Sequence, residues 1–331
     1  MASLKEGRRV KLRHSRSLPL LATTGVLAIL YTSASLLYPG FFTVRVFLNL
    51  LGDNAFLGIT AIGMTFVILS GGIDLSVGAV VAFTGTLIAS LLTRGTPPGW
   101  AMLLALAIGS TFGGAMGFLI HRYELPPFLV TLGGMFFARG MSFVVSKESV
   151  GITHPLYQQA SDFGLPVAGG ASLPLTGILF LGVVALGVTV AHGTRFGRNL
   201  YALGGNEASA RLMGLPVGGV KIAAYALNGF CSALAGIVAT LYMGSGNPAM
   251  GFGLELDAIA SVVIGGTLLT GGAGSPAGTL VGVLIFGTLQ TALVFDGRLN
   301  SWWLRIAVGL LLLLFILLQR VLSRPAGARH P

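Results

Sequence analysis

The chain has 331 residues, of which 54% are hydrophobic and only 9% are charged, and its mean hydropathy is +0.86. A water-soluble domain carries far more charge, so this composition indicates an integral membrane protein. The net charge of +10 does not indicate nucleic-acid binding, because the basic residues gather at the ends of apolar segments and in a short N-terminal arm.

Apolar segments of about 20 residues, long enough to cross a bilayer as a helix, recur along the whole chain. They predict an all-α integral membrane protein with about ten transmembrane helices. In chain order these cover residues 18–37, 47–69, 74–93, 100–120, 127–145, 174–192, 220–243, 255–270, 276–294 and 303–321.

The distribution of basic residues predicts the orientation, because Lys and Arg near span ends stay on the cytoplasmic side. With both termini in the cytoplasm, four basic residues fall outside, namely Arg45, Arg94, Lys147 and Arg298. Those that fall inside are Lys5, Arg8, Arg9, Lys11, Arg13, Arg16, Arg122, Arg195, Arg198, Arg211, Lys221, Arg320, Arg324 and Arg329.

Residues 1–17 form a basic cytoplasmic arm, which can also contact anionic lipid headgroups. A signal peptide is the alternative, since Ser33-Ala34-Ser35 resembles a cleavage site. The apolar run is long for a signal peptide, however, and its removal would leave the second span wrongly oriented. We therefore expect an uncleaved first span and, at the other end, a cytoplasmic tail over 322–331.

The sequence shows no enzymatic motif. Cys231, the single cysteine, lies in an apolar span, and the five histidines lack metal-ligand spacing, so we expect no metal and no cofactor. A Walker A loop needs a Gly-Lys pair, which does not occur in the sequence. The segment that begins Gly272-Ala-Gly274 resembles a dinucleotide-binding motif but misses its spacing by one residue, so we interpret it as a turn. Uphill transport would therefore draw energy from an ion gradient or from a separate ATPase subunit.

The polar segment 193–219 interrupts the apolar pattern. Asn206 is a good N-cap, Glu207 suits the first turn of a helix, and Gly214 followed by Pro216 ends it. This pattern predicts a two-turn helix in a cytoplasmic loop. A helix that short gains stability by inserting into a partner protein, although it could instead lie on the lipid surface.

The segment Arg195-Phe-Gly-Arg-Asn-Leu-Tyr-Ala-Leu-Gly-Gly-Asn206, continued to Gly214, resembles the coupling loop of ribose-type sugar permeases of ATP-binding cassette (ABC) importers. Two further motifs resemble the same family, Ile68-Leu-Ser-Gly-Gly-Ile-Asp-Leu-Ser-Val-Gly78 and Glu255-Leu-Asp-Ala-Ile-Ala-Ser-Val-Val-Ile-Gly-Gly-Thr-Leu-Leu-Thr-Gly-Gly-Ala-Gly274. The three motifs stand in the family's order, and the resemblance covers nearly the whole chain.

Within that family, three shorter motifs resemble one of the paired permeases of galactofuranose importers. These are Asp53-Asn-Ala-Phe-Leu-Gly58, Gly134-Met-Phe-Phe-Ala-Arg-Gly140 and Asp296-Gly-Arg-Leu-Asn-Ser-Trp-Trp303. The resemblance implies one permease domain over 1–331 in the bacterial inner membrane. It also implies a cytoplasmic ATPase, a second permease forming a homodimer or heterodimer, a periplasmic sugar-binding protein and a small sugar substrate.

The resemblance assigns ATPase coupling to the loop 193–219. Its residues are Arg195, Gly197, Arg198, Gly205, Asn206, Glu207, Ala208, Ala210, Arg211 and Gly214. Importers of other classes carry Glu-Ala-Ala with a glycine close behind, whereas here Glu207-Ala-Ser-Ala reaches Gly214 at a longer spacing. From importers of those other classes we therefore infer only the role of the loop, and not the role of each residue in it.

Polar and aromatic residues within the spans are candidates for the substrate path. An intramembrane carboxylate is costly and invites a functional interpretation, but Asp74 with Ser76 can also cap the third span, which we favour. Asn54 and Arg139 could bind sugar hydroxyls, although Arg139 could instead pair with Asp53 or Glu255. Phe136 and Phe137 could face a sugar ring, and packing is the simpler interpretation.

Two other classes of protein remain open. An ion-driven secondary sugar carrier would need no ATPase partner, but no symmetry between the chain halves is evident. A membrane-embedded enzyme would need a catalytic nucleophile or a metal cluster, and the sequence shows no pattern typical of either. The importer permease is therefore the expected function.

Overall fold

The computed structural model describes residues 2–298 and 302–322. The predicted tail 322–331 lies outside this range except for residue 322, as do residues 299–301 of the motif that ends at Trp303. The helices are α1 (Ala2–Leu37), α2 (Val44–Asp53), α3 (Ala55–Leu69), α4 (Val77–Thr93), α5 (Pro98–Arg122), α6 (Pro127–Val145), α7 (Pro155–Asp162), α8 (Leu175–Gly193), α9 (Arg195–Gly205), α10 (Glu207–Leu212), α11 (Val217–Met243), α12 (Leu254–Ile264), α13 (Pro276–Asp296) and α14 (Trp302–Leu322).

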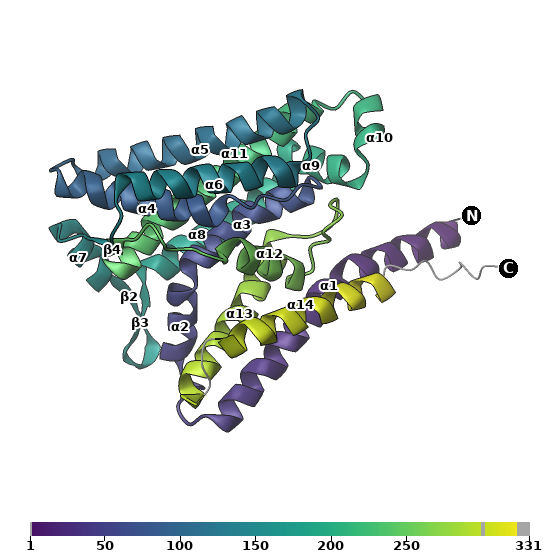
Figure 1. Cartoon of the computed structure of the whole chain (residues 1–331). Coiled ribbons are helices and arrows are strands. Elements are labelled where there is room, and N and C mark those ends of the chain that lie inside the picture. Colours follow the sequence, from purple (N-terminus) through teal and green to yellow (C-terminus); the bar gives the residue numbers. More distant parts are fainter. Residues whose placement is uncertain (1, 299–301, 323–331) are drawn as a thin grey trace.

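Helices α5, α6 and α11 run roughly side by side, while α1, α13 and α14 run at an angle to them (Figure 1). Helices α9 and α10 lie at one end of the bundle, called here the α10 end. The opposite end carries α7 and two short antiparallel ladders. In one, β1 (Val150–Gly151) pairs with β4 (Ser245–Gly246); in the other, β2 (Gly164–Val167) pairs with β3 (Ala171–Pro174). A short 3-10 helix over Ala168–Gly170 joins β2 to β3. The predicted exterior loop after residue 145 therefore contains structure that the all-α prediction missed.

Helix α11 forms the centre of the bundle and packs against α3, α4 and α5. Its crossing with α5 is close because glycines face each other: a side chain on Gly113 or Gly229 would overlap backbone atoms of the other helix. These packed helices bury α3 almost completely. Helices α9 and α10 are therefore adjacent to a tightly packed core.

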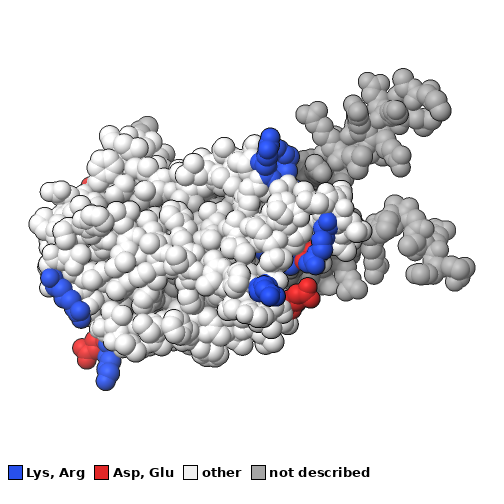
Figure 2. Space-filling model, turned by 90° about the horizontal axis from the view of Figure 1, so that it is seen from above, with Lys and Arg blue, Asp and Glu red and all other residues white. Residues whose placement is uncertain are grey.

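Six helices of the described chain are long and apolar enough to cross a membrane, and a bent α2–α3 pair would make a seventh. Helix α4 and the segment Trp302–Leu317 are shorter apolar helices. Charged side chains gather toward the two ends, with a broad uncharged surface between them (Figure 2). This distribution fits a multi-pass membrane protein, while the total of ten spans stays a prediction.

Two predicted spans and the boundary of the predicted N-terminal arm differ from the structure. The span 47–69 is broken at Asn54, where α2 and α3 meet at a bend of 57°. The span 255–270 is helical only over the 11 residues of α12, about 16 Å at 1.5 Å per residue, which is roughly half of a bilayer's hydrocarbon core. The arm 1–17 is not separate from the first span, because α1 is continuous from Ala2.

Candidate functional site

The α10 end carries two consecutive short helices where the sequence predicted one. Thr194 caps α9 by accepting a hydrogen bond from the Gly197 backbone N–H at 3.1 Å. Asn206 caps α10 in the same way, accepting from the Ser209 N–H at 2.8 Å. Gly214, with a φ of +77°, adopts the left-handed conformation that ends the turn. The predicted helix is therefore confirmed with both of its caps, and α9 was missed.

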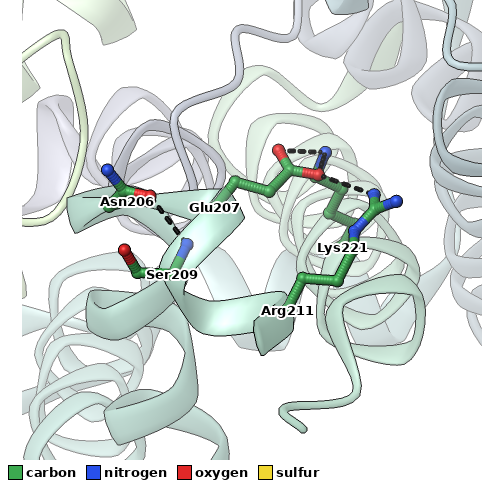
Figure 3. A network of polar contacts seen from close by, with 5 residues as sticks. All are labelled: Asn206, Glu207, Ser209, Arg211 and Lys221. Atoms are coloured by element: carbon green, nitrogen blue, oxygen red, sulfur yellow. Dashed lines mark hydrogen bonds and ion pairs between the residues drawn. The ribbon is translucent and has the colours of Figure 1, made fainter. Parts of the chain in front are cut away.

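Glu207 joins α10 to α11 (Figure 3). The Lys221 Nζ lies 2.8 Å from Glu207 Oε1 and 2.7 Å from Oε2, and Arg211 approaches Oε1 at 3.4 Å. Partial burial raises the pKa of Glu207, but the hydrogen bonds and charges of Lys221 and Arg211 outweigh this effect and lower it overall. The carboxylate is therefore ionised at neutral pH, and its stabilising contribution is lost only as pH falls through this lowered pKa.

The outer surface of α10 is apolar at its tip. Leu212 is 89% exposed and Met213 is 69% exposed, while Ala210 is fully buried against the bundle. Arg195, Arg198, Gly205, Ala208 and Arg211 are also exposed, and Gly197 is buried. An exposed Leu-Met pair flanked by basic residues has the composition of a protein-binding surface.

Helix α9 is attached to the bundle at three points. Phe196 stacks on Phe66 of α3 with ring centroids 6.2 Å apart, and the Tyr201 hydroxyl donates to the Gly274 carbonyl at 2.8 Å. Gly204 lies against the Leu69 carbonyl, which accepts a hydrogen bond from the Gly272 N–H at 3.0 Å. Movement of α9 would therefore reach both the end of α3 and the loop before α13.

Asp74 is buried between α3 and α4. Its Oδ1 accepts from the Ser76 N–H at 2.8 Å and from the Ser76 hydroxyl at 2.7 Å, and its Oδ2 accepts from the Asn228 amide at 2.8 Å. The carboxylate thus holds the start of α4 and ties it to α11. This geometry supports the interpretation of Asp74 as a cap.

We expect Asp74→Ala to lower the melting temperature of the purified complex, since each buried donor left unpaired costs about 1–3 kcal/mol. Asp74→Asn keeps an acceptor for Ser76 and should lose less stability and retain transport, as judged by thermal unfolding and uptake into proteoliposomes. Loss of uptake in Asp74→Asn with an unchanged melting temperature would instead favour a role in the substrate path.

Arg139 on α6 holds a loop rather than pairing with Asp53. Its guanidinium donates to the carbonyls of Pro248 at 2.9 Å and Met250 at 2.6 Å, and lies 4.1 Å from the centre of the Phe252 ring. Asp53 instead accepts from the Tyr242 hydroxyl at 3.2 Å. The alternative pairing of Arg139 with Asp53 was therefore wrong.

The two phenylalanines of the candidate substrate path lie on the outside of the molecule. Phe136 is 67% exposed and Phe137 is 63% exposed, and Phe137 stacks on Phe112 of α5 with centroids 6.0 Å apart. They point away from the bundle interior, as expected for side chains that face lipid. The structure thus does not bring Phe136, Phe137, Asp74 and Asn54 together.

Two of the candidates line cavities: Phe137 lies at one of about 350 Å³ between α5 and α6, and Asn54 lies at a larger one. Asn54 is buried at the break between α2 and α3, and its amide donates to the Leu50 carbonyl at 2.9 Å. The cavity beside it has a volume of about 720 Å³ and is lined by residues of α2, α3, α11, α12, α13 and α14. Sequence reasoning missed it, although Gln290 and Arg305, two polar residues within apolar spans, were a signal.

Comparisons with known proteins agree with the motifs. Residues 46–317 match the family model described as branched-chain amino acid transport system / permease component. The inner membrane ABC transporter permease protein YjfF of Escherichia coli (strain K12) is 52% identical over 309 residues, which cover 93% of each chain. No solved structure matches.

Two further relatives have names that include a sugar. The ribose import permease protein RbsC of Bacillus subtilis (strain 168) is 39% identical, over 89% of this chain and 90% of the relative. The fructose import permease protein FruG of Bifidobacterium longum (strain NCC 2705) is 37% identical, over 94% and 93%. These matches extend over nearly all of the apolar helices as well as α9 and α10. The chain therefore belongs to this permease family and is a multi-pass inner-membrane permease subunit of an ABC transporter, not an enzyme.

Proposed function

We propose that this chain is the permease subunit of a monosaccharide importer and that its substrate is galactofuranose. The observation that carries the sugar assignment is the whole-length similarity to ribose and fructose import permeases. The choice of galactofuranose rests on the motifs at 53–58, 134–140 and 296–303. Ribose, xylose or a related small sugar is the alternative substrate.

In this proposal the surface around α10 receives the partner ATPase. Leu212 and Met213 supply the exposed apolar contact, and Arg195, Arg198 and Arg211 surround it with positive charge. Closure of the ATPase subunits would move α9 and α10, and Lys221 would pass that movement to α11 through Glu207. The α10 end would then lie in the cytoplasm, as the positive-inside rule predicts.

The opposite end would face the periplasm and receive the sugar-binding protein. Helix α7 and the β2–β3 ladder lie toward that end (Figure 1). A second permease, identical or a close sibling, would complete the path, because importers of this kind use two permease subunits. The paired permeases that the motifs resemble make a heterodimer the expected form.

The test is uptake of labelled galactofuranose and ribose into proteoliposomes that hold this chain, its sibling permease and the ATPase. The binding protein is supplied outside, and ATP is present or absent inside. We expect galactofuranose to enter only with ATP. Selective ribose uptake would contradict the substrate, and uptake that follows an ion gradient without ATP would contradict the mechanism.

A further inference from the structure

The break between α2 and α3 opens into the cavity of about 720 Å³, within the size range of sites that bind small molecules. It lies away from α10: its walls come from α2, the C-terminal half of α13, the last turn of α11 and the first turns of α3, α12 and α14. Broken helices recur at substrate sites in transporters, because the interrupted backbone offers polar groups at membrane depth. This position suits a ligand that arrives from the end opposite α10.

The walls carry a mixture of polar groups that is unusual for a membrane interior. They are Asn49, Asp53, Asn54, Tyr242, Asp257, Gln290, Thr291 and Arg305. Asp53 and Tyr242 are joined by a hydrogen bond of 3.2 Å, while the side chains of Asp257, Gln290 and Arg305 make no hydrogen bond to another described residue. Carboxylate, amide and guanidinium groups with unused capacity are the partners that hydroxyl groups prefer.

Aromatic side chains also line the cavity. The guanidinium of Arg305 lies 5.2 Å from the centre of the Trp302 ring, and Phe286 and Phe295 also line the cavity. Aromatic rings offer an apolar surface with a polar edge, which suits the C–H face of a sugar ring. Polar groups that bind hydroxyls and aromatic rings that contact the sugar ring are the two requirements for holding a carbohydrate.

We propose that this cavity binds one neutral monosaccharide on its way through the permease, with Arg305, Asp257 and Gln290 contacting its hydroxyls and Trp302 contacting its ring. The inference rests on the proposed function. The charges of the lining argue for a neutral ligand, since the lining carries two carboxylates and one guanidinium. A phosphorylated sugar would meet net negative charge and be repelled.

The test compares two pairs of residues of the same type, and in each pair only one residue lines the cavity. Trp302→Ala is paired with Trp303→Ala, and Arg305→Leu with Arg298→Leu. In reconstituted complexes with saturating binding protein, we expect Trp302→Ala and Arg305→Leu to lower maximal sugar uptake about tenfold, or 1.4 kcal/mol. The two controls should stay near the wild-type rate, and ATP hydrolysis should persist in all four, because α10 lies at the other end.

Binding itself is measured by fluorescence. In the complex whose permease has Trp302 as its only tryptophan, through Trp100→Phe and Trp303→Phe, titration with galactofuranose or ribose should change the Trp302 emission to saturation, and a sugar phosphate should not. A wild-type complex that transports sugar while Trp302→Ala and Arg305→Leu match their controls would overturn the cavity assignment alone. A wild-type complex that transports no monosaccharide would overturn the proposed function as well.

Discussion

Glu207→Arg is expected to uncouple ATP hydrolysis from uptake in the reconstituted transporter. The substitution removes the contacts of 2.7 and 2.8 Å to Lys221 and places a third cation beside Lys221 and Arg211. The direct polar link between α10 and α11 would become a repulsion, so movement of α10 would no longer reach the central helix. We expect ATPase activity within about twofold of wild type and uptake lowered about tenfold or more.

The small contribution of the Glu207–Lys221 ion pair to folding stability allows an effect on coupling to be distinguished from an effect on folding. The Glu207 side chain is 40% exposed, and partly exposed pairs contribute only about 0.2–1 kcal/mol to folding. The melting temperature of Glu207→Arg should therefore change little. A large fall in melting temperature alongside the lost uptake would show instead that the pair is needed for folding.

Reversing the charge of Lys221 should restore the uptake that Glu207→Arg loses. Glu207→Arg combined with Lys221→Glu restores an attractive pair with the charges exchanged, and uptake should recover substantially. Glu124→Arg is the matched control, because Glu124 is an exposed acid in the turn between α5 and α6 that makes no ion pair with a described residue. Full uptake by the single variant Glu207→Arg, or equal loss in Glu124→Arg, would refute this coupling route.

The caps of α10 could be predicted from sequence because they depend on local chemistry. Asn206 binds the Ser209 N–H three residues away, and Gly214 supplies a backbone conformation that other residues rarely adopt. Helix α9 was missed because Gly204 and Gly205 have low helix propensity and made the segment resemble a loop. Packing against α3 and the loop before α13 stabilises that helix.

The helix break and the cavity could not be predicted in this way. Apolar residues continue on both sides of Asn54, so hydropathy alone predicts one straight span. Likewise, the carbonyls that bind Arg139 lie more than one hundred residues later in the chain, at Pro248 and Met250. Hydropathy indicates which residues enter the membrane, whereas the partners of polar residues depend on how distant helices pack.

Gly204→Ala is expected to have the second large effect, because Gly204 lies where three segments meet without room for a side chain. A Cβ there would overlap the Leu69 carbonyl oxygen and lie 3.0 Å from the Leu69 carbonyl carbon. The Leu69 oxygen already binds the Gly272 N–H, so it cannot move away without breaking that bond. Overpacking of this kind costs about 1–3 kcal/mol.

Gly205→Ala is the matched control for this site. Gly205 lies on the same helix one residue later, and a Cβ there would meet no atom within 4 Å. Alanine at this position should leave stability unchanged or raise it by up to about 1 kcal/mol through better helix propensity. Thermal unfolding and ATP-dependent uptake of the two variants separate crowding at Gly204 from any general effect of replacing a glycine.

The two alanine variants also test whether the α10 end closes the path. If α9, the end of α3 and the loop before α13 must stay in contact to seal the permease, forcing them apart at Gly204 should let sugar leak without ATP. We therefore expect Gly204→Ala to lower the melting temperature and to raise ATP-independent efflux from loaded proteoliposomes, and Gly205→Ala to do neither. Equal behaviour of the two variants would mean that this contact neither packs tightly nor seals the permease.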